Sequence, residues 1–185
     1  LLTGEFEAAR PGAKRAEAAN RLAAVLTREK ALSNTYHFTR NTTEDSLRWV
    51  LYSGLAQYYY DQALFRKCIR SAQLAIPPTC ALKDTTGWFT LLTMQTEAYV
   101  RTGDFDGARQ SIRTCLEVAE KQGNPERLAA AYNNMGALYH HMRDDSFSIV
   151  MYRKGLETLR RIPASESLPM RAELLRNLGG AYGEM

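Results

Sequence analysis

The chain has 185 residues, and 24 Lys and Arg residues against 20 Asp and Glu residues give it a formal charge of +4. Hydrophobic residues make up 45% of the sequence, which is ordinary for a folded protein and argues against a disordered chain. The 24 alanines and 22 leucines, against five valines and five isoleucines, favour helix over sheet. Basic residues are scattered and no apolar run reaches membrane-spanning length, so we expect neither direct nucleic-acid contact nor a membrane span in this segment.

The first 32 residues are less regular than the rest of the chain. Residues 4–9 resemble the turn and second helix of a repeat, Pro11-Gly12 interrupts them, and a helical pattern then resumes. We therefore assign residues 1–32 to a partial or degenerate N-terminal repeat. Residues 33–43 are polar and are expected to form a loop, which contains the isolated His37.

Residues 45–78 form the first regular repeat, with two amphipathic helices. Apolar residues recur at three- and four-residue spacing along both halves, which places them on one face of each helix. Asp45 is the expected N-cap of the first helix. Pro77 and Pro78 are expected to end the second helix, because proline lacks an N–H and disfavours helix in the residue before it.

Two further repeats occupy residues 88–120 and 127–161, and residues 170–185 form the first helix of a truncated repeat. Gly103-Asp104 supplies a turn and a new N-cap between the two helices of the middle repeat. Residues 162–169 are the expected connection before the last helix. Together the repeats predict one all-α solenoid domain of antiparallel helix hairpins.

A fixed period relates these repeats. Tyrosines recur at intervals of 40, 40 and 43 residues, at Tyr59, Tyr99, Tyr139 and Tyr182. Small residues follow the same 40-residue step at Cys68, Ala108 and Ser148. Further small residues, at Ala56, Gly136 and Gly179, would let neighbouring helices approach closely. We expect the four tyrosine rings to fill the grooves beside them and to lie in a continuous core.

The repeats resemble tetratricopeptide repeats. In the third repeat, Tyr132, Met135-Gly136 and Tyr139 match the pattern of the family's first helix, and Ser148 and Tyr152 match that of the second. The resemblance covers residues 46–185, although the family's usual period is about 34 residues. It implies a right-handed superhelix without catalytic activity, which binds a protein or peptide. It also implies that the chain is a fragment of a larger bacterial regulatory or sensor protein.

The first helices of the repeats are expected to line a concave surface. The residues that lie off their apolar stripes form the candidate peptide-binding groove, namely Gln57, Thr93, Glu97, Arg101, Asn133, Asn134, Arg176 and Asn177. The resemblance implies that an asparagine at the position of Asn134 and Asn177 holds a peptide backbone, and an amide can donate and accept at once. The alternative is that these asparagines only solvate the groove.

Other reactive side chains are expected to have structural roles. His140-His141 are adjacent on a helix and point about 100° apart, so they cannot chelate one ion. Cys68 and Cys115 occupy small-residue helix positions and are expected to be buried, whereas Cys80 lies in a predicted loop. Asp144-Asp145 are best explained as helix caps. We therefore expect no catalytic residue, no metal site and no cofactor.

Two functions remain open at this point. The chain is either a protein- or peptide-binding module or a structural spacer that self-associates as a homo-oligomer through its open repeat ends. An apolar end face at Leu175, Leu178 and Tyr182 would be the surface for self-association. The ligand of a binding module could be a linear peptide or a small molecule. Free cysteines and the absence of a signal-peptide pattern predict a cytoplasmic protein.

Overall fold

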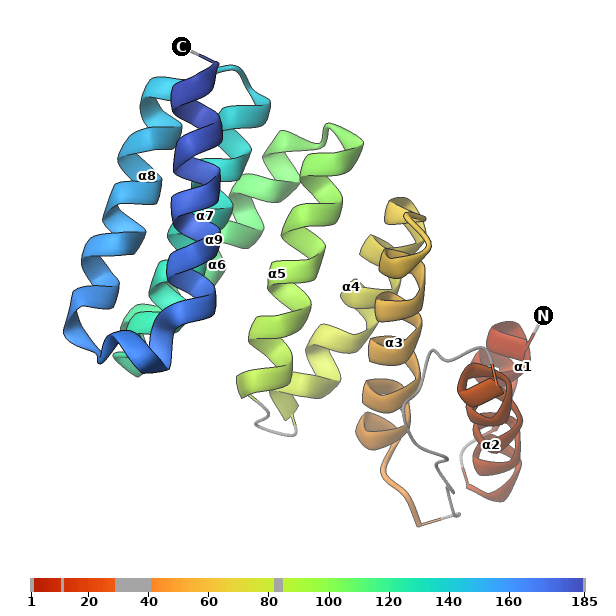
Figure 1. Ribbon diagram of the computed structural model, residues 1–185. Coiled ribbons are helices and arrows are strands. Elements are labelled where there is room, and N and C mark those ends of the chain that lie inside the picture. The colour runs from red at the N-terminus through yellow and green to blue at the C-terminus, as the bar shows by residue number, and fades with distance from the viewer. Residues whose placement is uncertain (1, 11, 29–40, 82–84, 185) are drawn as a thin grey trace. The chain divides into compact units, whose positions relative to one another are not determined.

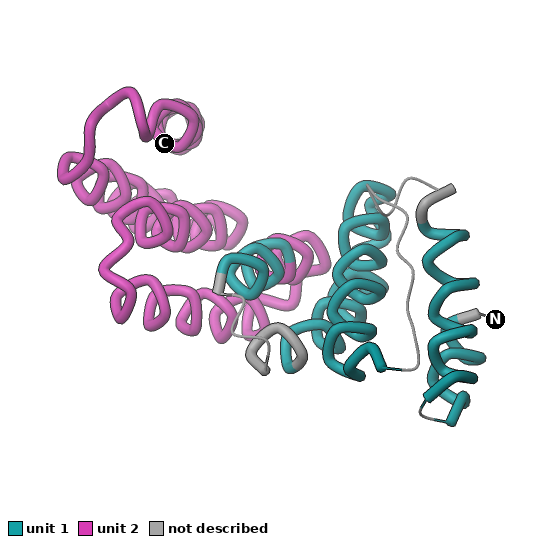
Figure 2. The backbone as a smooth tube through the Cα atoms, turned by 90° about the horizontal axis from the view of Figure 1, so that it is seen from below, with its two compact units in different colours: residues 1–94 teal, residues 95–185 magenta. Residues whose placement is uncertain are grey.

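The computed structural model describes residues 2–10, 12–28, 41–81 and 85–184 (Figure 1). Within these ranges the secondary structure is helical, with no strand. The chain forms two compact units, residues 1–94 (unit 1) and residues 95–185 (unit 2), which Figure 2 shows in different colours. In the described part of the chain, every helix is too short or too polar to cross a membrane.

Unit 1 holds the N-terminal helices of the chain and one antiparallel helix pair. Its helices are α1 (Leu2–Ala8), α2 (Ala13–Arg28), α3 (Glu44–Asp61), α4 (Phe65–Ala81) and the first part of α5 (Thr85–Thr102). Helices α3 and α4 pack along each other as an antiparallel pair. The buried guanidinium of Arg15 donates to the backbone oxygen of Ala9 and to Oε1 of Glu44, at 3.1 and 2.6 Å. This side chain ties α2 to the end of α1 and to α3.

Unit 2 begins within α5 and continues as a stack of antiparallel helices. These are α6 (Phe105–Gln122), α7 (Pro125–His141), α8 (Asp145–Thr158), the short 3-10 helix η1 (Leu159–Arg161) and α9 (Ala164–Gly183). Each helix from α6 to α9 packs on the next one, and α7 also contacts α9. Helix α7 therefore lies against α6, α8 and α9, and it also contacts η1.

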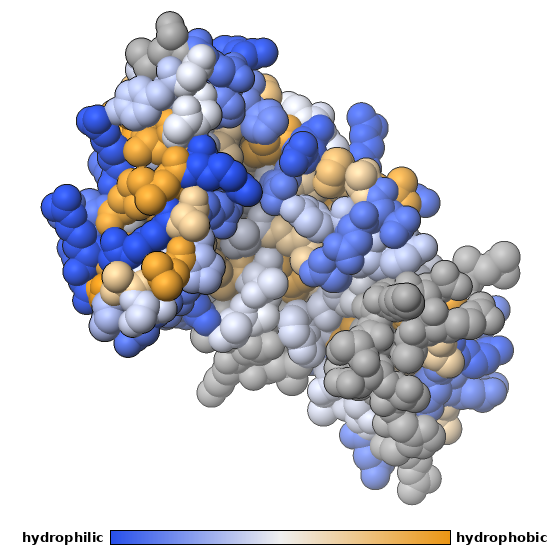
Figure 3. Space-filling model, viewed as in Figure 1, coloured by the Kyte–Doolittle hydropathy of each residue, from blue (hydrophilic) through white to orange (hydrophobic). Residues whose placement is uncertain are grey.

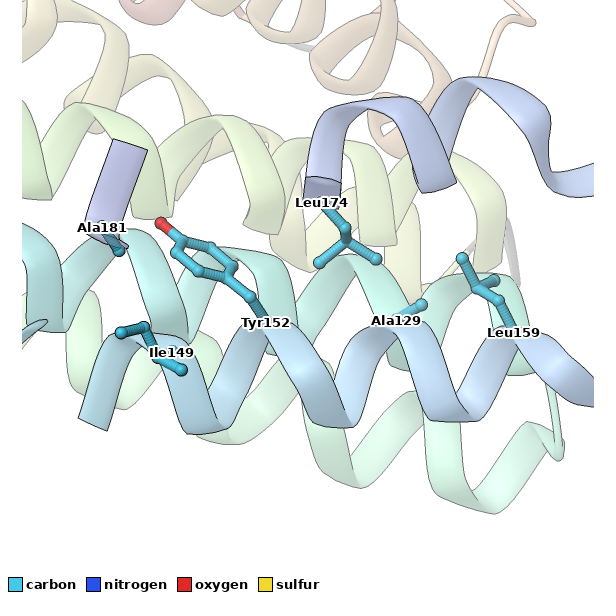
Figure 4. Close-up of a cluster of buried hydrophobic side chains, with 6 residues drawn as sticks. All are labelled: Ala129, Ile149, Tyr152, Leu159, Leu174 and Ala181. Carbon is cyan, nitrogen blue, oxygen red and sulfur yellow. The ribbon is translucent and has the colours of Figure 1, made fainter. Parts of the chain in front are cut away.

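Tyr152 of α8 packs at the centre of a hydrophobic cluster in unit 2. Figure 4 shows its ring between side chains of α8 and α9, and the buried members of the cluster are Ala129, Ile149, Tyr152, Leu159, Leu174 and Ala181. Its ring also lies against Gly136 of α7, where a Cβ atom would be 2.4 Å from Cε1 of Tyr152. The predicted close helix approach at Gly136 is confirmed, because any side chain there would overlap the ring.

The 40-residue register of the second helices is also confirmed. Cys68, Ala108 and Ser148 are fully buried at equivalent places on α4, α6 and α8. Cys115 is buried as well, as expected. His37, most of the predicted loop 33–43 and the side chain of Cys80 lie outside the described residues.

Of the four aspartates predicted to cap helices, Asp104 and Asp144 are N-caps, whereas Asp45 and Asp145 lie inside their helices. Asp104 accepts a hydrogen bond from the backbone N–H of Gly107 at 2.9 Å, and Asp144 accepts one from Phe147 at 3.2 Å. The prediction for Asp45 is wrong, because Thr43 is the N-cap of α3 and accepts from the N–H of Ser46 at 3.2 Å. Asp45 lies in the first turn, where its negative charge favours the positive end of the helix instead.

The prolines end fewer helices than their sequence positions predict. Helix α4 continues past Pro77 to Ala81. Helix α9 begins at Ala164 and includes Pro169, so only residues 162 and 163 of the expected connection 162–169 lie outside a helix. A side-chain contact ties the start of α9 to η1. The guanidinium of Arg171 donates to the backbone oxygen of Leu159 and to Oγ of the buried Ser167, which fixes the first turns of α9.

The four repeated tyrosines do not form one continuous buried row. Tyr59, Tyr99 and Tyr139 are half-buried, and the ring of Tyr139 lies 5.1 Å from that of Phe147. Tyr182 is 47% exposed, which contradicts the prediction for this ring. The prediction for Gly179 is also wrong, since a Cβ atom there would meet no atom within 4 Å.

Candidate functional site

Six of the eight predicted groove residues border one hollow of about 200 Å³ in unit 2. The hollow lies among the last two turns of α5, the middle of α7 and α9. The six are Glu97, Arg101, Asn133, Asn134, Arg176 and Asn177. The other two predicted residues, Gln57 and Thr93, belong to unit 1 and do not line it.

Two asparagines and a glutamate form a hydrogen-bonded chain along one wall of the hollow. Nδ2 of Asn177 donates to Oδ1 of Asn133 at 2.9 Å, and Nδ2 of Asn133 donates to Oε1 of Glu173 at 2.9 Å. Asn133 is buried, so these bonds fix the orientation of its amide. The chain links α7 to α9 and leaves further acceptor capacity on Glu173 and Asn177.

Asn134 presents an unused hydrogen-bond donor at the same hollow. Its Nδ2 atom is buried and has no hydrogen-bond partner. A buried donor without a partner costs about 1–3 kcal/mol, and a ligand that supplies an acceptor would recover part of this cost. This is the feature of the hollow that most directly points to a polar ligand.

Charged side chains of both signs surround these amides. Arg101 and Glu97 pair along α5 at 3.6 Å, and Arg176 of α9 contributes a second guanidinium. His141 also lines the hollow. Loss of solvent around its ring, followed by the positive charge of Arg101, lowers the pKa of His141 below its usual value. The imidazole is therefore uncharged at neutral pH and can accept a hydrogen bond.

The two adjacent histidines have different surroundings. Nδ1 of His140 lies 2.6 Å from Oδ1 of Asp145, in the first turn of α8, whereas His141 faces the hollow. Their ring centres are 6.4 Å apart, and the rings lie at 68° to each other. His140 thus joins two helices, as a structural role requires. In the described ranges, no three His, Cys, Asp or Glu side chains gather as a metal site would need.

The sequence prediction missed Glu173, His141, Thr96, Val100 and Ala137, which also line the hollow. Helical spacing could have found two of them, because residues four apart share a face. Glu173 precedes Asn177 by four residues, and Ala137 follows Asn133 by four. Of the two predicted residues in unit 1, Gln57 is exposed and donates to Asp61 at 2.8 Å. Oγ1 of Thr93 is buried and has no hydrogen-bond partner.

Comparison with known proteins agrees with the repeat pattern. Residues 97–161 match the family model described as tetratricopeptide repeat. This segment is similar to tetratricopeptide repeats. Such repeats are generally protein-interaction modules, and in this chain the matched segment supplies the α5 and α7 walls of the hollow. No curated protein matches the chain.

A solved structure is similar over nearly the whole chain. The crystal structure of BtubC (BKLC) from P. vanneervenii has 20% sequence identity and a TM-score of 0.66, with 98% of this chain and 66% of that chain covered. This likeness concerns the fold. Together with the family match at residues 97–161, it confirms an all-α fold of the helical-repeat, solenoid type.

Proposed function

We propose that unit 2 binds an extended segment of another polypeptide in the hollow among α5, α7 and α9. The buried, unpartnered Nδ2 of Asn134 is the observation that carries this proposal. An extended backbone exposes a carbonyl acceptor at every residue, and one of these can satisfy that donor. Asn177 lies across the hollow and offers an amide already oriented by Asn133.

The charged rim gives the proposed site its selectivity for ligand side chains. Arg101 and Arg176 favour acidic side chains on the bound segment, while Glu97 and Glu173 favour basic ones. The guanidinium and carboxylate groups thus set which sequence binds. The amides, which hold the backbone, would contribute affinity for any extended peptide.

Peptides selected from a random library on the wild-type chain provide the probes that test this function. We expect the double variant Asn134→Ala and Asn177→Ala to bind the selected fluorescein-labelled peptides several-fold more weakly in fluorescence anisotropy. Gln110→Ala, an exposed change on α6 outside the hollow, is the matched control and should bind as the wild type does. Equal affinity of the double variant and the control would remove the hollow as the binding site.

A second probe separates backbone recognition from side-chain recognition. Methylation of single backbone nitrogens removes donors, and replacement of single amides by esters weakens acceptors. We expect at least one ester replacement to weaken binding to the wild type and to have little further effect on Asn134→Ala. If every replacement acts equally on the two proteins, Asn134 does not hold the peptide backbone.

Self-association through α9 is a second candidate function. Leu168, Leu175 and Tyr182 are spaced by seven residues, so they share one face of the helix, and they are 60%, 56% and 47% exposed. Figure 3 shows hydrophobic side chains gathered on the surface over α8 and α9. We propose that a second copy covers this face.

Sedimentation velocity at several concentrations tests self-association. A dimer that dissociates on dilution is expected, and Leu168→Glu with Leu175→Glu should abolish it. Leu64→Glu, which changes an exposed leucine of unit 1, is the control and should leave the dimer intact. A monomer at every concentration rejects this candidate.

We also propose, from the family resemblance, that the module is the sensing or interaction segment of a larger regulatory protein. The sequence of the full-length gene tests this role. A DNA-binding or histidine-kinase domain encoded in the same reading frame supports the role, and a reading frame that encodes only helical repeats contradicts it.

A further inference from the structure

Unit 1 contains a second hollow, of about 560 Å³, among α1, α3 and α4. Helix α1 has only seven residues, and it reaches the hollow through Thr3, Gly4 and Glu7. A Cβ atom on Gly4 would meet no atom within 4 Å, so the space beside it is open. The hollow has the size that small ligands occupy.

Aromatic and aliphatic side chains line part of this hollow. Tyr52 and Leu55 of α3 are buried, and Tyr59 and Leu74 are half-buried. The rings and methyl groups of these side chains would contact a ligand bound in the hollow. An apolar body would gain from contact with them, because apolar surface would leave water on both sides.

The charge of the hollow is positive. The one carboxylate among its lining residues, Glu7, is already engaged: it lies 3.0 Å from the guanidinium of Arg48 and accepts a hydrogen bond from the hydroxyl of Tyr52. Lys67 and Arg70 stand one turn apart on α4, and both are exposed. Nζ of Lys67 lies 5.6 Å from the ring centre of Tyr59.

Lys67 and Arg70 are the groups available to a ligand. Within the described part of the chain, neither of them takes part in an ion pair, so their charges are not compensated. An arginine beside a lysine suits a carboxylate, because guanidinium can donate two parallel hydrogen bonds to its two oxygens. The hollow thus combines two cations with an apolar wall.

We propose that this hollow binds a small organic carboxylate with an aromatic or aliphatic body. The carboxylate lies between Lys67 and Arg70, and the body contacts Leu55, Tyr59 and Leu74. This site belongs to unit 1 and is independent of the peptide site proposed for unit 2. A ligand of this class needs both its charge and its hydrocarbon part, which makes the proposal testable with simple probes.

Three probes separate the two contributions in isothermal titration calorimetry with the full chain. The probe 2-naphthoate carries both charge and ring, naphthalene-2-methanol carries only the ring, and acetate carries only the charge. We expect saturable binding of 2-naphthoate and at least tenfold weaker binding of each of the other two. Equal binding of 2-naphthoate and the alcohol, or no saturable binding of 2-naphthoate, overturns the proposal.

Variants on the two elements that form the hollow provide independent tests. Lys67→Gln with Arg70→Gln should weaken 2-naphthoate binding at least tenfold, while Arg66→Gln, an exposed cation of α4 outside the hollow, should leave it unchanged. Gly4→Phe should fill the open space and weaken binding, and Ala8→Phe, an exposed change on the same helix, should not. If the control variants weaken binding as much as the test variants do, the ligand lies elsewhere.

Discussion

Single atoms decide how closely α7 and α8 approach. Because a Cβ atom at position 136 would lie 2.4 Å from the ring of Tyr152, Gly136→Ala forces the ring or the helix to move. We expect a loss of about 1–3 kcal/mol in the free energy of unfolding, measured with urea. Gly179→Ala is the matched control, since nothing lies within 4 Å and alanine favours helix by about 1 kcal/mol. A loss of stability in both variants would contradict this explanation.

Tyr152 also makes the stability of unit 2 depend on pH in alkaline solution. Burial raises the pKa of its hydroxyl to about 12, against 10 for an ordinary tyrosine. The folded state therefore holds its proton more tightly than the unfolded state does, so this contribution to stability is complete below pH 10 and is lost by pH 12. The expected slope is about 1.4 kcal/mol per pH unit in that range. Urea unfolding at several pH values should show a smaller slope for Tyr152→Phe.

At the scale of helical elements, the turn inside each hairpin repeats one unusual backbone conformation. Ala63, Gly103 and Arg143 are spaced by 40 residues, and all three have positive φ, at 54°, 76° and 64°. Side chains disfavour this conformation and glycine does not. Ala63→Gly should therefore stabilise the chain by about 1 kcal/mol, and Gly103→Ala should destabilise it by a similar amount, in thermal or urea unfolding. A loss of stability in Ala63→Gly, or a gain of stability in Gly103→Ala, would show that other contacts set these turns.

The elements also show what the sequence could and could not predict. Buried small residues such as Cys68, Ala108 and Ser148 follow from periodicity, because every hairpin packs its second helix in the same way. The face of α9 around Gly179 could not be predicted, since its packing depends on a neighbouring helix and not on its own pattern. Asn134 follows from the family pattern and Glu173 from its four-residue spacing to Asn177, but that they meet at one hollow depends on how α9 packs beside α7.

At the scale of the whole molecule, the chain divides into two compact units that a uniform repeat period does not mark. Each helix in a repeat array contacts mainly its neighbours, so a local loss of packing stays local. Gly136→Ala should therefore speed amide hydrogen exchange in α7 and α8 and leave α3 and α4 unchanged. Exchange followed by mass spectrometry checks this, and faster exchange throughout the chain would show that the two units unfold together.

The hydrogen bonds from Asn177 to Asn133 and from Asn133 to Glu173 affect the kinetics and the entropy of binding. They connect α9 to α7, and Tyr152 contacts the same two helices from α8, so the α7 and α9 walls are preorganised before any ligand arrives. Most of the conformational entropy lost on binding would therefore be lost by the peptide and not by the protein. Cyclised peptides that already hold the bound shape should therefore bind more tightly than their linear counterparts, chiefly through slower dissociation.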